Sequence, residues 1–146
     1  MVTANSTTTQ TEGIDLGRLW WASLLAGLAA AGVNAVIYVI ESAAGAIPQT
    51  VLVPSMNQPI TVVLVILNSF VPAILAGVLL ALLNRFTRRP VRLFRIIAAV
   101  VLLLSFINPF TIPGAPPAMI IALALMHVVA AAIIVGVLTT LPVRRQ

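Results

Sequence analysis

The chain has 146 residues, of which 61% are hydrophobic and only 8% are charged, whereas a soluble domain carries about 25% charged residues. The hydrophobic residues form blocks of membrane-spanning length, so the composition excludes a soluble protein and indicates an all-α membrane protein of one domain. The net charge of +5 comes from arginines that flank these blocks, which points to lipid head groups rather than nucleic acid, and the lack of cysteine excludes disulfides and thiolate-bound metals.

The N-terminal residues 1–17 are small and polar without any periodicity, and we expect them to form a disordered tail. The first apolar segment covers about residues 19–40. It is longer than the hydrophobic region of a signal peptide, which has roughly 7–15 residues, and only Arg18 precedes it. These features favour an uncleaved membrane span over a signal peptide.

Three more apolar segments follow, at about residues 61–83, 93–107 and 117–141. The third should end or kink at Asn108-Pro109, because proline does not continue a regular helix. Pro116-Pro117 suits the start of the fourth, since proline is tolerated in a first turn. The predicted organisation is a four-helix transmembrane bundle over residues 18–141, followed by a short tail at 142–146.

The arginines all fall on one side of such a bundle. Arginine-rich loops stay in the cytoplasm, so both termini are predicted to be cytoplasmic. Arg18 precedes the first span, and Arg144 and Arg145 follow the fourth. The loop between the second and third spans carries Arg85, Arg88, Arg89, Arg92 and Arg95. We expect these five to set the topology and contact lipid head groups, with a docking site for a partner protein as the alternative.

The opposite side of the bundle holds seven of the ten prolines. Its longest segment, PQTVLVPSMNQPITVV, contains two runs of β-favouring residues around SMNQ. These runs predict either a short hairpin over the outer end of the bundle or an irregular extended cap.

Small residues recur at four-residue steps on two of the spans. Such faces let helix backbones approach closely, so we expect them to point into the bundle. On the first span Ala22, Ala26 and Ala30 precede Asn34 and Tyr38, and on the second Ser69 is followed by Ala73, Gly77 and Ala81.

Polar side chains within the spans are few and lie at similar depths. With a rise of about 1.5 Å per residue, they fall between mid-membrane and the outer surface in all four helices. The predicted polar set is Asn34, Tyr38, Glu41, Asn68, Ser69, Ser105, Asn108 and His127.

His127 is the only histidine and stands inside the apolar stretch LALMHVVAAA. One interpretation is an interhelical hydrogen-bond network that locks the four helices together. The other is a small polar pocket, open toward the outer face, that binds a ligand or passes a proton, because ionisable residues within membranes are commonly functional. A neutral imidazole has one donor and one acceptor nitrogen for either role. Glu41 would join this site only if the outer segment folds inward, and is otherwise expected to be solvated.

Catalysis has little support in the sequence. A metal site needs several histidine, cysteine or carboxylate ligands, so we expect no metal and no cofactor. A serine nucleophile would need Ser69 or Ser105 beside His127 and an orienting acid, for which Glu41 is the nearest candidate. We therefore name no catalytic residue and rank a membrane enzyme third among the functions considered.

The stretches NRFTRRPVRLFRIIAAVVLLLS at 84–105, LALMHVVAA at 123–131 and AGVNAVIYVI at 31–40 resemble a family of small bacterial four-helix integral membrane proteins of unknown function. The similarity extends from about Arg18 to Leu141, and its most distinctive matches are Thr87-Arg88-Arg89-Pro90, Phe94-Arg95 and Met126-His127. The resemblance implies the same four-span topology without an established activity. It marks Asn34, Ser105 and His127 as characteristic positions and assigns them no role.

We therefore expect a multi-pass protein of the bacterial inner (plasma) membrane without enzymatic activity. Its leading expected function is that of a homo-oligomer or an accessory subunit of a larger membrane complex. The alternative is a protein that binds or transports a small molecule, lipid or proton through the pocket around His127. Membrane lipids are the expected partners in either case, and nucleic acid is not.

Overall fold

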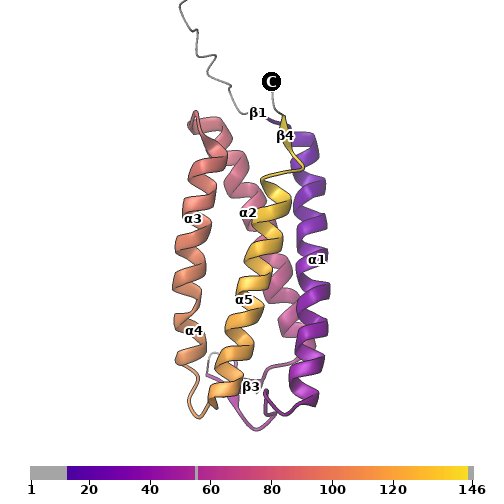
Figure 1. The fold of residues 1–146 in the computed structure, drawn as a ribbon, viewed down its shortest axis with the longest axis vertical. Helices are drawn as coiled ribbons and strands as arrows, with labels where there is room; N and C mark the ends of the chain where they lie inside the picture. The colour runs from indigo at the N-terminus through magenta and orange to yellow at the C-terminus, as the bar shows by residue number, and fades with distance from the viewer. Residues whose placement is uncertain (1–12, 55, 145–146) are drawn as a thin grey trace, which may run out of the picture.

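A computed structural model of the protein describes residues 13–54 and 56–144, and its main elements are helices that run side by side (Figure 1). Within these residues four helical segments are long and apolar enough to cross a membrane, which confirms the predicted all-α four-helix membrane fold. The third segment combines two helices. The helices are α1 (Leu16–Ala43), α2 (Val62–Phe86), α3 (Pro90–Ser105), α4 (Ile107–Phe110) and α5 (Pro117–Leu138).

The two ends of the described chain pair with each other, although we expected the N-terminal one to be unstructured. Strand β1 (Gly13–Ile14) runs antiparallel to β4 (Val143–Arg144). The carboxylate of Asp15 accepts hydrogen bonds from the amides of Gly17 and Arg18, at 2.9 and 3.2 Å, and caps α1. The prediction of disorder was wrong for residues 13–17, because strand pairing and the helix cap satisfy their backbone groups. Residues 1–12 and 145–146, Arg145 included, lie outside the described residues.

A short β-hairpin connects α1 to α2 at the other end of the bundle (Figure 1). Its strands, β2 (Leu52–Val53) and β3 (Gln58–Pro59), pair antiparallel with Leu52 opposite Pro59. Asn57 adopts the left-handed conformation, with a φ of 50°, in the loop between them. Of the two alternatives for this segment the hairpin is confirmed, with Ser55 of its loop outside the described residues.

Pro109 accounts for the break between α3 and α4. Proline has no amide hydrogen for the carbonyl four residues earlier, and its ring collides with that carbonyl. The residue four positions before Pro109 is Ser105, where α3 ends. Because α4 continues through Pro109 to Phe110, the proline kinks the third span without ending it.

α1 packs closely along α2 and α5. Its contact face contains Ala22, Ala26 and Ala30, which are buried, and α2 presents Ala73 and Gly77. A Cβ atom on Gly77 would overlap the side chain of Ser23, so the helices meet there at the closest distance that these residues allow. The prediction that the small residues face the interior is confirmed.

α3 makes far fewer contacts with its neighbours. Near the α2–α3 turn it is held by Phe94, which is buried in the apolar core that α1 shares, and by Arg95, whose Nη2 donates to Thr139 Oγ1 at 3.1 Å. At the hairpin end, Pro109 of α4 is buried. The third span is therefore anchored near both ends and leaves space along its middle.

Candidate functional site

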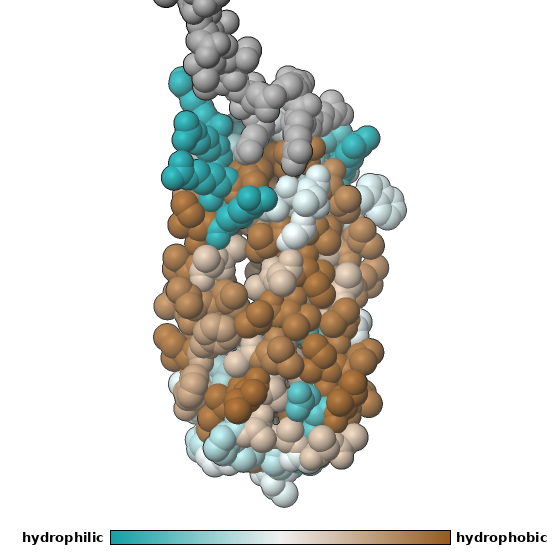
Figure 2. Space-filling view, in the orientation of Figure 1, coloured by the Kyte–Doolittle hydropathy of each residue, from teal (hydrophilic) through white to brown (hydrophobic). Residues whose placement is uncertain are grey.

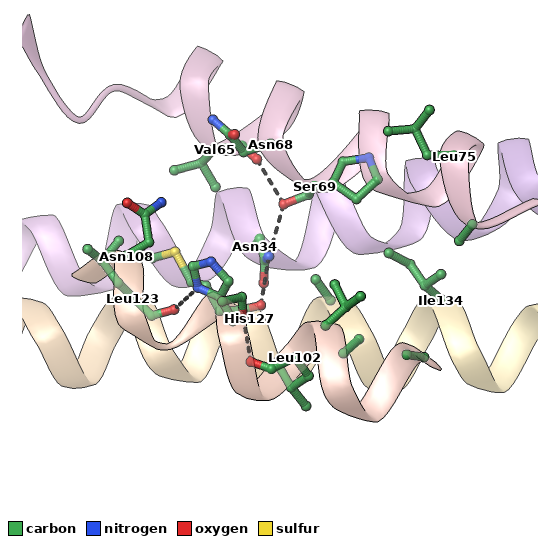
Figure 3. Close-up of a pocket in the computed structure, with 18 of the residues that line it drawn as sticks. Asn34, Val65, Asn68, Ser69, Leu75, Leu102, Asn108, Leu123, His127 and Ile134 are labelled. Carbon is green, nitrogen blue, oxygen red and sulfur yellow. Dashed lines mark hydrogen bonds between the residues drawn. The ribbon is translucent and has the colours of Figure 1, made fainter. Parts of the chain in front are cut away.

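A cavity of about 730 Å³ occupies the space between α2, α3 and α5 (Figure 3). Val53 and Met56 of the hairpin segment line one end of it, whereas Leu79, Phe94 and Val135 line the end toward the arginine-rich turn. In the space-filling view the surface is hollowed between the third span and α5 (Figure 2). The cavity thus follows the stretch over which α3 stands away from the bundle.

The lining is polar at one end and apolar along the rest. No charged side chain of the described residues lines the cavity. Its polar members come from α1, α2, the third span and α5, and they gather in the half nearer the hairpin. They are Asn34, Asn68, Ser69, Ser105, Asn108 and His127. The structure therefore brings together six of the eight polar residues singled out from the sequence.

Tyr38 and Glu41, the other two, do not line the cavity. The hydroxyl of Tyr38 donates to the main-chain oxygen of Ile60 at 2.8 Å and accepts a hydrogen bond from Gln49 at 3.3 Å. Tyr38 therefore ties the loop before α2 to α1. Glu41 is half-buried in the last turn of α1. The polar set predicted from helical depth is thus divided between the cavity and the end of α1.

Asn34 is the polar centre of the site. Its Nδ2 donates to Ser69 Oγ at 2.9 Å and to the main-chain oxygen of Met126 at 3.0 Å. A carbonyl oxygen can only accept, so the contact with Met126 fixes which end of the Asn34 amide points to α5. Asn34 is 3% exposed, and its Oδ1 is buried without a hydrogen-bond partner. The Asn34 side chain thus joins three helices through its two amide hydrogens, while its carbonyl oxygen is left without a hydrogen bond.

One ring nitrogen of His127 forms a hydrogen bond within its own helix, α5. Nδ1 lies 2.6 Å from the main-chain oxygen of Leu123. Because that oxygen only accepts, Nδ1 carries the proton, and Nε2 of the neutral ring is an acceptor. Figure 3 shows the ring within the cavity, between α5 and α2. No described residue donates a hydrogen bond to Nε2.

The remaining polar groups also bond within their own helices. Ser69 Oγ donates to Val65 O at 2.8 Å, and Ser105 Oγ donates to Leu102 O at 2.7 Å. Asn68 Nδ2 donates to Leu64 O at 2.9 Å. The predicted interhelical network is therefore present for α1, α2 and α5 through Asn34, and the polar side chains of the third span do not take part in it. Hydroxyl and amide groups in helices bond readily to the carbonyl one turn earlier, and here only Asn34 reaches other helices.

This geometry does not assemble a serine nucleophile in the described residues. The hydroxyl protons of Ser69 and Ser105 point to main-chain carbonyls, and Nδ1 of His127 faces a carbonyl rather than an acid. Glu41, the acid considered from the sequence, is not part of the lining. The arrangement is suited to binding rather than to proton transfer between a nucleophile, a base and an acid.

The apolar part of the site escaped the sequence analysis. Phe94, Ala98 and Val101 of α3 and Ala130 and Ile134 of α5 line it. The only signal in the sequence was that Ala98 and Ala130, which line this part, have small side chains that leave space beside them. An apolar residue in a membrane helix looks the same in the sequence whether it faces lipid, a neighbour or a cavity.

The five loop arginines lie at the opposite end of the bundle from the hairpin, where Figure 2 shows a hydrophilic patch. Arg85, Arg88, Arg89, Arg92 and Arg95 are all exposed. Both described chain ends lie at this same end of the bundle (Figure 1).

The fold and the lining define a multi-pass membrane protein with a mainly apolar cavity among its helices. The chain belongs to the family described as a family of unknown function (DUF6069), whose profile matches residues 14–142. No curated protein and no solved structure matches the chain.

Proposed function

We propose that this protein is a non-enzymatic membrane protein that binds one amphiphilic small molecule in the cavity between α2, α3 and α5. The observation that carries this proposal is the cavity itself, with about 730 Å³ of space, six polar residues at one end and apolar walls elsewhere. Small-molecule sites have roughly 300–1,000 Å³ and are mainly apolar with a few converging polar groups. An amphiphile matches both parts of this lining.

The way in which the polar groups are bonded favours binding over a purely structural role. A structural lock would use these groups to join helices, yet the side chains of Ser105, Asn68 and His127 bond only to carbonyls of their own helices. Their positions in the lining leave acceptor atoms available to a guest. The alternative function from the sequence, the polar pocket, therefore takes precedence over the oligomer or accessory subunit.

We further propose that the protein resides in the bacterial plasma membrane with both termini in the cytoplasm and the hairpin outside. The exposed arginines at the end of the bundle that holds the chain ends support this orientation, because arginine-rich loops remain cytoplasmic. The polar end of the cavity then lies in the outer half of the membrane.

Native mass spectrometry of the protein, extracted from its own membrane, tests the proposal. We expect each chain to retain one small amphiphile, which its mass identifies. Ala98 lines the cavity, so Ala98→Trp should fill the apolar part and remove the bound mass. Ala99→Trp is the matched control, because Ala99 is exposed on the same helix and should leave binding unchanged.

Two outcomes would contradict the proposal. One is a bare monomer in both the wild type and the Ala99→Trp variant. The other is a dimer or larger complex without small adducts that Ala98→Trp dissociates, which would make the cavity a protein interface and support the oligomer or accessory role. The protein can also be expressed in another host. If the amphiphile is then absent, its source is the native bilayer.

A further inference from the structure

We infer that the polar end of the cavity selects a neutral amphiphile that donates a hydrogen bond, such as a long-chain alcohol or an amide, over one that only accepts or is anionic. This inference rests on the proposed function and names the chemical class of its ligand. It follows from which hydrogen-bonding atoms the protein has already used.

The inner donors of the polar end are occupied by the protein. Both hydrogens of the Asn34 amide are bound, one by Ser69 Oγ and one by Met126 O. The hydroxyls of Ser69 and Ser105 donate to Val65 O and Leu102 O. The proton of His127 is held by Leu123 O. None of these four residues has a hydrogen left for a guest.

The same residues retain acceptors. His127 Nε2 has a free lone pair, and Ser105 Oγ can still accept after donating its proton. Asn34 Oδ1 is a further acceptor without a partner, but it is buried on a side chain that is 3% exposed and is not open to the cavity. A buried polar atom left unpaired costs about 1–3 kcal/mol. A donor on the guest would supply a partner to the acceptors that His127 Nε2 and Ser105 Oγ offer in the lining.

The donors that remain lie at the surface. Asn68 has one amide hydrogen beyond the one that Leu64 O accepts, and no described residue bonds to the side-chain amide of Asn108. Both residues are exposed, whereas Asn34 and Ser69 are buried. A ligand that only accepts hydrogen bonds would therefore find its partners at the exposed rim rather than beside Asn34.

An anionic group fits the site poorly. No cationic side chain of the described residues lines the cavity, and the loop arginines lie at the far end of the bundle. An unpaired charge is costly within a membrane. The side-chain hydrogens of Asn34, Ser69 and Ser105 are already bonded within the protein and do not bind an anion, so a neutral head group is selected.

Photocrosslinking with three matched probes tests the inference. The probes are a hexadecyl alcohol with a diazirine in its chain, the methyl ether of the same alcohol, and its phosphate monoester. Each is added to the protein in nanodiscs at equal concentration, and labelled protein is counted by intact mass. One net hydrogen bond predicts a roughly three- to tenfold preference for the alcohol over the ether. The phosphate should label least, and peptide mapping should place the crosslinks on lining residues of α3 and α5.

His127→Phe should lower the alcohol-to-ether ratio, because phenylalanine fills similar space without the acceptor Nε2. His127→Gln keeps an acceptor and should retain part of the preference, which separates loss of the hydrogen bond from loss of the ring. Ala99→Trp should behave like the wild type. A melting temperature for each variant confirms that folded proteins are compared.

The outcomes separate the two proposals. If the ether labels the cavity as well as the alcohol, the cavity binds amphiphiles and the inference about donors is overturned. If the phosphate labels it most, the inference is likewise overturned. If no probe gives crosslinks that Ala98→Trp abolishes, both the donor preference and the proposed binding function are rejected. An alcohol-to-ether ratio that is unchanged in His127→Phe would also overturn the proposed hydrogen bond to His127.

Discussion

The side-chain amide of Asn34 donates a hydrogen bond to the main-chain oxygen of Met126, 3.0 Å away and 92 positions later in the chain. Met126 directly precedes His127, so this bond ties α1 to the turn of α5 that presents the imidazole. The second hydrogen of the same amide binds Ser69 on α2. Asn34 therefore sets how three helices meet at the polar end of the cavity.

Because the amide nitrogen of Asn34 faces Met126 O, substitutions by leucine and by aspartate should change the stability of the protein by different amounts. Asn34→Leu should change the free energy of unfolding by about 1 kcal/mol or less, since hydrogen bonds between membrane helices average about 0.6 kcal/mol. Asn34→Asp has nearly the same shape but turns a carboxylate oxygen toward Met126 O. A charged aspartate in mid-membrane costs about 2.5 kcal/mol or more, so the aspartate variant should be the less stable of the two. Thermal unfolding in detergent at neutral pH measures both.

A change at an exposed position of the same helix provides the control. Gly32 is exposed, and a Cβ atom there would meet nothing within 4 Å. Gly32→Asp therefore carries the cost of an acid in the same span without opposing a buried carbonyl, and any extra loss of stability in Asn34→Asp measures that opposition. If Asn34→Asp is as stable as Asn34→Leu, the amide direction described above is incorrect.

The close approach of α1 and α2 predicts a strong effect at Gly77. A Cβ atom on Gly77 would overlap Ser23, so Gly77→Ala forces the helices apart. Overpacking of this kind costs about 1–3 kcal/mol, which should lower the melting temperature. Gly32→Ala is the matched control, because it adds the same methyl group to open space and should be neutral or slightly stabilising.

A double variant tests whether the contact with Ser23 is the cause. Ser23→Gly removes the side chain that a Cβ atom on residue 77 would meet, so Ser23→Gly together with Gly77→Ala should recover part of the stability lost in Gly77→Ala alone. Strictly additive losses would show that the destabilisation arises elsewhere.

The proposed orientation can be tested by cysteine labelling, because the natural chain contains no cysteine. Thr50 is exposed in the loop before β2, and Arg88 is exposed in the α2–α3 turn. In intact cells, a membrane-impermeant maleimide should label Thr50→Cys and leave Arg88→Cys unlabelled. After lysis both should react equally. The reverse pattern would place the arginine-rich end outside.

Tyr38 should stabilise the hairpin end of the bundle rather than the cavity. Tyr38→Phe removes the 2.8 Å hydrogen bond to Ile60 O and should reduce stability by about 1 kcal/mol. Amide hydrogen exchange of the segment 52–60 should become faster, whereas the alcohol-to-ether ratio of the cavity should stay unchanged. A changed ratio with unchanged exchange would assign Tyr38 to the binding site instead.

Much of the architecture follows from local sequence patterns. The length of the apolar blocks predicts four membrane-spanning segments, and the four-residue spacing of Ala22, Ala26 and Ala30 predicts the buried face of α1. Pro109 predicts the interruption of the third span. These features depend on helix geometry, on hydrophobic length and on the missing amide hydrogen of proline, all of which act within one segment of the chain.

Other features depend on long-range contacts. Residues 13–17 look unstructured in isolation, because their pairing partner lies at residues 143–144. Depth along a helix placed Tyr38 and Glu41 with His127, but depth carries no information about the direction in which a side chain points or the atom it meets. The structure therefore separates these two residues from the cavity.

By itself, the sequence determined that this is a four-helix membrane protein, that α1 packs through small residues, and that polar groups gather in one half of the bundle. Only the tertiary structure decided that α3 stands apart from α2 and α5, that the space between them is a cavity, and that donors at its polar end are used while acceptors remain. The physical reason is that hydropathy and periodicity are properties of single helices. A cavity and its unpaired atoms exist only once several helices have been placed against one another.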